Sequence, residues 1–386
     1  MRQLAILDST LREGEQFTRA CFTLEQRLTI ARLLDTIGVT FIEVPSPIAS
    51  PETRQAIHTL CNLDLRAHIV AHVRCVEADV QAALDTHVFG LNLFYGTSTA
   101  LRTFSHGRRI EQMIADAVPL IRRIHAAGRY VRFSAEDAFR SDLVDLLHVF
   151  DAVVDAGVQR IGLPDTVGIA TPRQVEQLVR LCKERYPHVG IEFHGHNDTG
   201  CAIANTITAF EAGADCLDVT ALGIGERNGI AALSGLIAQI YIHYPELLSS
   251  YDLTQVASLD QFVADCLNMT IPFNTPITAP SAFTHKAGVH TKAVLRNPHA
   301  YEVLNPADFG LIRHVDVGSR ITGRYAIGHR AAALGLNLSN DEVSRLTIAL
   351  KERAEHGSLS QEGVDEFILS WHLMESQDVR EGISAL

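Results

Sequence analysis

Over the first 244 residues, short apolar runs alternate with longer segments in which apolar residues recur every three or four positions. The short runs have the length of β-strands, and no two of them are joined by the two-residue turn of a hairpin. The longer segments have the period of amphipathic helices, and some begin with a capping residue such as Thr23 or Thr171. This alternation predicts parallel strands connected by helical crossovers.

Eight strands and eight helices are expected in this part of the chain. The strands are predicted at residues 4–10, 40–44, 67–72, 90–95, 130–136, 160–163, 191–198 and 216–220. The helices are predicted at residues 24–37, 51–60, 76–85, 110–127, 142–156, 200–212 and 228–242, with one more opening at Pro172. Eight such units predict an α/β fold, a (β/α)8 TIM barrel over residues 1–244. A doubly wound open sheet is the alternative, but it needs a glycine-rich turn after the first strand, which is missing after residue 10.

Beyond residue 244 the alternation stops. Residues 245–310 are predicted to form a linker and lid segment, and residues 311–386 a small C-terminal helical domain. Two amphipathic helices are expected in that domain, at residues 340–356 and 360–371, the first capped by Ser339 or Asn340.

Composition excludes several classes of protein. The formal net charge is -12 and no long basic run is present, which disfavours nucleic acid and anionic membranes as partners. Seven scattered cysteines without a C-x-x-C pair argue against a disulfide framework and a structural zinc site. No apolar run reaches about 18 residues and no signal segment is recognisable, so a cytoplasmic protein is expected.

Candidate chemistry centres on the seventh predicted strand, which carries His194 and His196. Residues two apart in a strand point to one face, and Gly195 between them has no side chain. With Glu13 after the first strand, they could hold a metal ion and leave open positions for a substrate. Hydrogen-bonded strand histidines are the plainer interpretation. A two-histidine, one-carboxylate set also serves oxygen-activating iron, although the predicted barrel argues against that chemistry.

Other polar side chains also fall at or near the ends of the predicted strands. In a barrel these ends meet at one mouth, where active sites form. The residues concerned are Glu13, His72, Asn92, Arg132, Ser134, Glu136, Thr166, His194 and His196.

Five longer motifs show a resemblance to a known family. They are LDSTLREGEQ at residues 7–16, RFSAED at 132–137, FHGHND at 193–198, LGIGERNG at 222–229 and HKAGVH at 285–290. They resemble the homocitrate synthases, within the acyl-CoA-condensing family that includes isopropylmalate and citramalate synthases. The resemblance implies a metal-dependent condensation of acetyl-CoA with 2-oxoglutarate and hydrolysis of the thioester to homocitrate and CoA, in lysine biosynthesis by the aminoadipate route.

The resemblance also implies roles for individual residues. The implied ligands of a divalent metal (Mg, Mn, Zn or Co) are Glu13, His194 and His196. The implied 2-oxo acid site comprises Arg12, Gln16, His72, Asn92, Arg132, Ser134 and Thr166. The implied catalytic groups are Arg12, Glu136, His290 and Tyr301. In this family the last two reach the barrel mouth of the neighbouring subunit, so a homodimer with exchanged lid segments is expected.

Asn92 departs from the family pattern, because homocitrate synthases usually carry aspartate there. That aspartate helps to bind the ammonium group of the inhibitor lysine, so weak inhibition by lysine is expected here, despite Glu192. Asn92 also leaves open a sister synthase that uses oxaloacetate, phosphonopyruvate, pyruvate or 2-oxoisovalerate. A lyase running the reverse reaction and a non-catalytic metabolite sensor are further alternatives. The presence of candidate base residues argues against the sensor.

Overall fold

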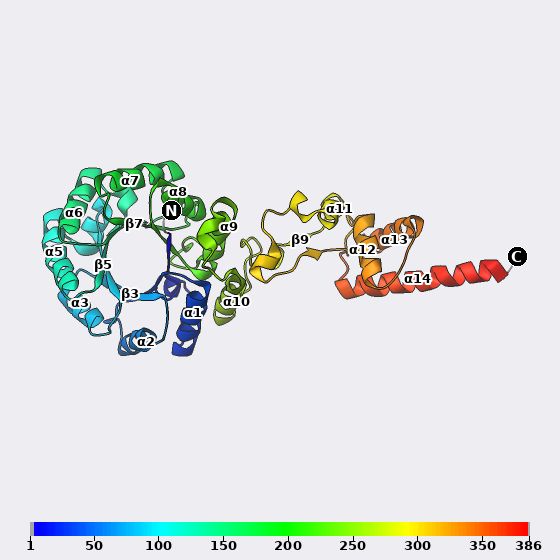
Figure 1. The fold of residues 1–386 in the computed structure, drawn as a ribbon, viewed down its shortest axis with the longest axis horizontal. Coiled ribbons are helices and arrows are strands. Elements are labelled where there is room, and N and C mark those ends of the chain that lie inside the picture. The colour runs from blue at the N-terminus through cyan, green and yellow to red at the C-terminus, as the bar shows by residue number, and fades with distance from the viewer. Residues whose placement is uncertain (1–3, 385–386) are drawn as a thin grey trace. The chain divides into compact units, whose positions relative to one another are not determined.

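The computed structural model describes residues 4–384, and its first part is the predicted TIM barrel (Figure 1). Each strand pairs in parallel with the next, and the last strand pairs with the first to close the ring. The strands are β1 (Ala5–Asp8), β2 (Phe41–Val44), β3 (His68–Arg74), β4 (Gly90–Gly96), β5 (Tyr130–Glu136), β6 (Arg160–Asp165), β7 (Gly190–Gly195) and β8 (Cys216–Val219).

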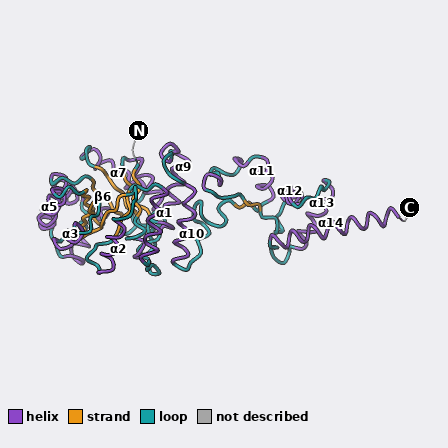
Figure 2. Tube along the Cα trace, turned by 60° about the horizontal axis from the view of Figure 1, so that its bottom comes forward, coloured by secondary structure: helices purple, strands orange, loops and turns teal. Residues whose placement is uncertain are grey.

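Helices surround the ring of strands (Figure 2). They are α1 (Leu24–Ile37), α2 (Pro51–Cys61), α3 (Glu77–Leu84), α4 (Thr99–Leu101), α5 (Ile110–Ala126), α6 (Leu143–Asp155), α7 (Pro172–Arg185), α8 (Ala202–Ala212), α9 (Leu233–His243) and α10 (Val256–Cys266). Local sequence explains the ends of α1. Thr23 and Gln26 form the predicted capping box, and Gly38 ends the helix at a φ of 104°, which glycine adopts without strain.

The interior of the barrel changes character along its axis. Near the amino ends of the strands, Leu7, Phe41, Val70 and Cys216 form an apolar cluster. Further toward the carboxyl ends the interior is polar although it is equally buried. This polar layer consists of Glu43, Asn92, Arg132, Glu192 and Asp218. The barrel therefore has an apolar floor below a charged layer that faces the mouth.

Several predicted elements differ in their bounds from the structure, most of all α14 (Gln361–Ser384), which ends at Ser384 rather than at residue 371, and two of the differences lie beside the candidate site. Strand β7 ends at Gly195, so His196 lies one residue beyond it and forms an isolated bridge to Ile230. Helix α9 begins at Leu233 rather than Asn228. The residues between Asn228 and Leu233 form backbone hydrogen bonds with the loop after β8 instead of helical ones. One example is the bond from the Ile230 N–H to the Gly223 carbonyl at 3.1 Å. Tertiary hydrogen bonding therefore overrides the helical pattern at this point.

The chain divides into two compact units, Met1–Ala279 and Pro280–Leu386. The second unit contains a two-stranded parallel pair and four helices among its described residues. These elements are β9 (Thr284–His285), β10 (His314–Val315), α11 (Gly288–Arg296), α12 (Arg324–Ala333), α13 (Asn340–Arg353) and α14 (Gln361–Ser384). Val317, Ile327, Leu346, Val364 and Ile368 are members of its own buried core. Within residues 4–384, no helix is long and apolar enough to cross a membrane.

Candidate active site

Three candidate metal ligands meet at the carboxyl end of the barrel. Glu13 follows β1, His194 lies in β7, and His196 comes two residues later. One potential ligand atom from each residue lies within 4.8 Å of the other two. Two imidazoles and one carboxylate at this spacing suit a divalent cation with open coordination positions.

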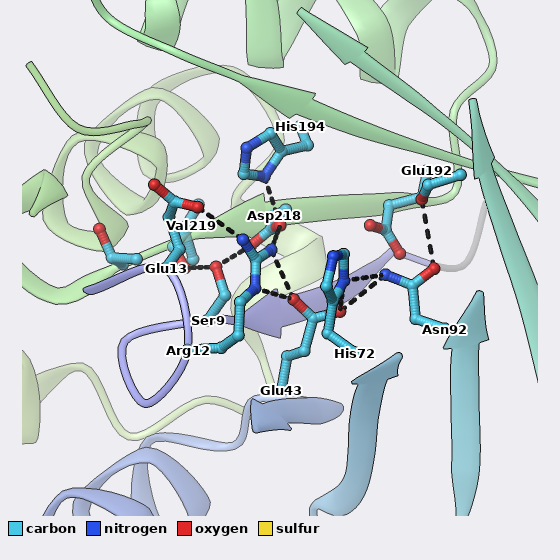
Figure 3. A network of polar contacts seen from close by, with 12 residues as sticks. Ser9, Arg12, Glu13, Glu43, His72, Asn92, Glu192, His194, Asp218 and Val219 are labelled. Carbon is cyan, nitrogen blue, oxygen red and sulfur yellow. Dashed lines mark hydrogen bonds and ion pairs between the residues drawn. The ribbon is translucent and has the colours of Figure 1, made fainter. Parts of the chain in front are cut away.

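His194 is oriented by a residue that the sequence analysis did not single out. Its Nδ1 lies 2.6 Å from a carboxylate oxygen of Asp218 on β8, and Ser9 donates a 2.5 Å hydrogen bond to the other oxygen (Figure 3). A neutral His194 that donates from Nδ1 keeps the lone pair of Nε2 for a metal ion. Such carboxylate–histidine pairs are the usual support of metal-bound imidazole.

Glu13 is held from two sides. Arg12 donates to one carboxylate oxygen at 2.5 Å, and the Glu226 N–H donates to the other at 2.8 Å. The loop after β8 approaches so closely that a Cβ on Gly225 would lie 2.6 Å from the Glu13 carboxylate. Glycine at this position therefore permits the contact that fixes the third ligand.

The protonation states suit metal binding. Burial lowers the pKa of both His194 and His196 to about 4, so both imidazoles are neutral near pH 7. Burial alone would raise the pKa of Glu13, but the charge of Arg12 and the hydrogen bond from the Glu226 N–H lower it below its ordinary value. Among the described residues, Nδ1 of His196 is a buried nitrogen without a hydrogen-bond partner. These three residues are therefore prepared to donate lone pairs to a cation.

A cavity of about 260 Å³ adjoins the three candidate ligands. Its lining includes all but one of the barrel residues predicted for the site. Those residues are Arg12, Glu13, Gln16, His72, Arg132, Ser134, Glu136, Thr166, His194 and His196. Phe94, Pro164, Asp218, Glu226 and Arg227 also line it.

Asn92, the remaining predicted residue, is buried beside this cavity. Its amide nitrogen donates to Glu43 at 2.9 Å and lies 2.7 Å from Nδ1 of His72, while its oxygen accepts from Ser134 at 3.2 Å. Figure 3 shows the amide nitrogen of Asn92 in contact with both the imidazole of His72 and the carboxylate of Glu43. Burial lowers the pKa of His72 to about 4, so its neutral Nδ1 can accept the second amide hydrogen.

Glu43 is a second functional residue that the sequence analysis missed. It is fully buried and contacts Arg12 at 2.6 Å and Arg132 at 3.0 Å as well as Asn92. Burial alone would raise its pKa, but the charges of Arg12 and Arg132 lower it well below its usual range. Glu43 and Asp218 are both acidic residues inside a short apolar strand, and that irregularity was the signal available in the sequence.

Arg132 has two carboxylate partners within the barrel, Glu43 and Glu192. Burial raises the pKa of Glu192. If Glu192 binds a proton, it no longer neutralises Arg132, and the positive charge of Arg132 becomes available to a bound anion. Arg12 likewise contacts Glu13 and Glu43, with Asp218 at 3.7 Å. Both of these arginine side chains are therefore already paired with carboxylates. These ion pairs hold the guanidinium groups in fixed positions.

Glu136 lines the cavity at the end of β5. Burial, followed by repulsion from Asp137, raises its pKa above the ordinary value of a glutamate. A carboxylate whose proton affinity is raised is a stronger base, so Glu136 suits removal of a proton from a weak carbon acid. Thr166 lies on the same side and accepts a 2.9 Å hydrogen bond from the Asp137 N–H.

His290 and Tyr301 belong to the second unit. His290 is in the first turn of α11 and Tyr301 follows the short helical turn Pro298–Ala300. Their rings stack with centroids 4.2 Å apart and an interplanar angle of 28°. Both side chains are exposed within this chain, and 49% of the Tyr301 surface is accessible. The structure thus brings together the two predicted catalytic residues of the lid segment.

Comparison with known proteins agrees with this geometry. The HMGL-like family model matches residues 3–263, and the model described as "Homocitrate synthase post-HMGL domain-like" matches residues 277–358. The cytosolic homocitrate synthase isozyme of Saccharomyces cerevisiae is 46% identical over 95% of this chain and 86% of its own length. The mitochondrial homocitrate synthase of Schizosaccharomyces pombe is 46% identical over 96% and 89%.

More distant relatives extend the pattern. The homocitrate synthase of Sulfolobus acidocaldarius is 38% identical over 90% of this chain and 75% of its own length. Among solved structures, the HMG-CoA lyase of Bacillus subtilis matches 70% of this chain and 96% of its own, with a TM-score of 0.62 and 20% identity, which supports the fold. The sequence matches over nearly the whole length show that the chain belongs to the homocitrate synthase family, with an HMGL-like barrel as its larger part.

Proposed function

We propose that this protein condenses acetyl-CoA with 2-oxoglutarate and hydrolyses the resulting thioester, which releases homocitrate and CoA. One observation carries the proposal: the candidate metal ligands, the cationic and hydroxyl groups and the Glu136 carboxylate all line one cavity. The homocitrate synthases that match this chain over most of its length support the substrate pair. The same family membership supports a role in lysine biosynthesis.

Glu13, His194 and His196 are the proposed ligands of a divalent metal ion. The donor set fits, because both imidazoles are neutral, one is fixed by Asp218 and the carboxylate is ionised. Mg, Mn, Zn and Co all accept mixed nitrogen and oxygen ligands. When bound, such an ion supplies Lewis acidity that polarises a keto group and orients a 2-oxo acid.

The proposed 2-oxo acid site is the part of the cavity next to these ligands. Arg12 is placed to stabilise negative charge that develops on the keto oxygen, because its guanidinium is fixed by Glu13 and Glu43. Gln16, His72, Arg132, Ser134 and Thr166 supply the remaining polar lining, with Asn92 fixing His72 and Ser134 from behind. A polar pocket with two arginines favours a dicarboxylate over an apolar 2-oxo acid.

Proton transfer is assigned to Glu136, His290 and Tyr301. Glu136 is the proposed base for the acetyl methyl group, since its raised pKa strengthens it as a base. The stacked and exposed His290 and Tyr301 are proposed to complete the site of a second copy, in a homodimer with exchanged lid segments. This arrangement would exclude water until condensation is complete.

The principal alternative is a sister synthase that acts on another 2-oxo acid. The presence of Asn92 where homocitrate synthases usually have aspartate supports this alternative. The Asn92 amide forms hydrogen bonds with Glu43, His72 and Ser134. Because an amide is neutral, the pocket lacks the negative charge that an aspartate would add at this position. A cytoplasmic location is also proposed. All seven cysteines are free, and matching relatives include cytosolic and mitochondrial isozymes.

The test is release of CoA thiol from acetyl-CoA with a panel of 2-oxo acids, before and after treatment with a chelator. We expect 2-oxoglutarate to give the highest kcat/KM and the chelator to abolish turnover. A higher kcat/KM with oxaloacetate, phosphonopyruvate, pyruvate or 2-oxoisovalerate would identify the sister synthase. No metal-dependent release with any acid would contradict the enzyme assignment.

A further inference from the structure

The barrel cavity cannot accommodate the whole of the proposed cosubstrate. Its volume of about 260 Å³ is below the roughly 300–1,000 Å³ of pockets that enclose drug-sized ligands. CoA is larger than such ligands, and its nucleotide end carries several phosphate charges. If the proposed function holds, these phosphates require cations outside the cavity, in a protein whose formal net charge is -12.

The second unit contains a local reversal of that charge. Residues 284–330 contain seven lysines and arginines against three acidic residues. The three acids have other partners: Glu302 contacts Arg313 and His285, Asp316 contacts Lys286, and Asp308 accepts from Asn305. The remaining positive charge is therefore uncompensated within this segment.

Three of these cations converge on one aromatic ring. Lys292 Nζ lies 5.1 Å from the centre of the Tyr325 ring, and the guanidinium carbons of Arg296 and Arg324 each lie 5.3 Å from it. No ion pair of these three residues with a carboxylate is found in the described part of the chain. We refer to Lys292, Arg296, Arg324 and Tyr325 as the basic cluster.

Helix packing holds the basic cluster together. Lys292 and Arg296 are four residues apart on α11 and so share one face, while Arg324 and Tyr325 open α12. The two helices approach each other closely at their first residues. A Cβ on Gly288 would lie only 2.9 Å from the Cα of Gly323, so glycine at this position permits the contact. A hydrogen bond from Arg324 and the nearby Lys292 and Arg296 charges also lower the pKa of the Tyr325 phenol, which reflects the positive potential.

We propose that the basic cluster binds the phosphate groups of the CoA nucleotide. Like charges held together without an acidic partner are unfavourable unless an anion neutralises them, and lysine and arginine donate to phosphate oxygens with charge-assisted hydrogen bonds. His290 lies two residues before Lys292 on α11, on a different face of the helix. The same short helix would therefore carry a catalytic residue on one face and nucleotide contacts on another.

The first experiment measures binding without turnover. Adenosine 3′,5′-bisphosphate is titrated calorimetrically into the full-length protein and into Lys292→Gln, Arg296→Gln and Arg324→Gln. Each change should weaken binding about threefold to tenfold, as expected for loss of one partly exposed charge contact to phosphate. Arg353→Gln, which removes an exposed arginine of α13, is the matched control and should bind as the unmodified protein does.

The second experiment separates nucleotide contacts from general damage. The cluster variants should lower kcat/KM with acetyl-CoA through KM, and should have no effect with S-acetylpantetheine, which lacks the nucleotide. Equal losses with both thioesters, or unchanged bisphosphate binding in all three variants, would overturn the proposal. So would loss of binding only in Arg109→Gln, which changes an exposed arginine directly before α5 and would place the phosphate contacts on the barrel unit.

Two further outcomes have defined meanings. Tight binding of pyrophosphate at the cluster without binding of adenosine 3′,5′-bisphosphate or of free CoA would indicate a free polyphosphate and would refute the CoA assignment. Because the titration needs no reaction, cluster-dependent binding in a protein that releases no CoA would support this inference while contradicting the proposed activity. The two proposals can therefore fail separately.

Discussion

Asn92→Asp is the most informative single change in the barrel, because it replaces one nitrogen by oxygen at a fully enclosed position. Asn92 is 1% exposed, and its amide nitrogen donates to Glu43 at 2.9 Å. An aspartate would face that ionised carboxylate with a second one. It would also lose the hydrogen that His72 accepts.

The magnitude follows from comparing two ways of relieving this contact. Two unit charges at the present 2.9 Å separation repel by about 6 kcal/mol with an effective dielectric constant of about 20. Binding one proton instead costs about 4 kcal/mol at pH 7, since an unperturbed aspartate has a pKa of about 3.9 and each pH unit is worth about 1.36 kcal/mol. Protonation is the smaller cost, so the variant should bind a proton on folding and lose up to about 4 kcal/mol of stability at pH 7.

The sign of the pH dependence is opposite to that of a salt-bridged aspartate. The folded-state pKa of the pair formed by Glu43 and the introduced aspartate would be raised above the unfolded value, so the penalty is absent near pH 4 and grows as the pH rises. It should amount to about 1.5 kcal/mol at pH 5. Urea unfolding followed by far-ultraviolet circular dichroism at pH 5, 6, 7 and 8 measures the difference from the unmodified protein.

Asn92→Ala is the matched control, because it removes the same hydrogen bonds without adding a charge. Its loss of stability should vary little across this pH range. Lysine should protect the aspartate variant and inhibit it more strongly than the unmodified protein, because the ammonium group can neutralise the pair. Equal losses for both variants at pH 5 and pH 8 would refute the electrostatic reasoning, and tight inhibition of the unmodified protein by lysine would refute the role assigned to Asn92.

Three further changes test the proposed site. His196→Ala should lose bound divalent metal and metal-dependent CoA release, as measured by elemental analysis and a thiol assay; full metal content would remove this residue from the ligand set. Asp218→Asn should weaken metal affinity about 10- to 100-fold, because His194 loses its orienting carboxylate, and a chelator competition titration would detect this; unchanged affinity would contradict that role. Glu136→Gln should lower kcat about 10²- to 10⁴-fold with little change in 2-oxoglutarate binding by calorimetry, and normal turnover would exclude it as the base.

The sequence predicted the barrel because strand and crossover patterns depend on local periodicity, which β5 at residues 130–136 and α1 at residues 24–37 follow to the residue. It failed at α9, where residues 229–232 have a helical pattern but are held by hydrogen bonds to the loop after β8. It also missed α11 and α12, which are short, and the apolar residues of α12 pack with those of α13 and α14 in the core of a small unit.

For the site, motif residues such as Glu13 and His194 could be predicted because chemistry restricts metal ligands to few residue types. Glu43 and Asp218 could not be assigned in the same way. Their importance depends on which arginine, amide or imidazole the closed barrel places opposite them. A buried charge in an apolar strand signals a partner, but the sequence does not say which one.

The polar layer above the apolar floor of the barrel has a consequence for adaptation to heat. Buried charges lose hydration on folding, and replacing such groups by apolar side chains of similar volume is often stabilising. Selection of this protein for thermostability alone should therefore replace Arg132 together with Glu43 and Glu192 by apolar side chains, because loss of one partner alone would leave a buried charge unpaired. Those variants should survive heating while they lose turnover. Selection for both properties should leave this layer intact and place its changes on the outer helices.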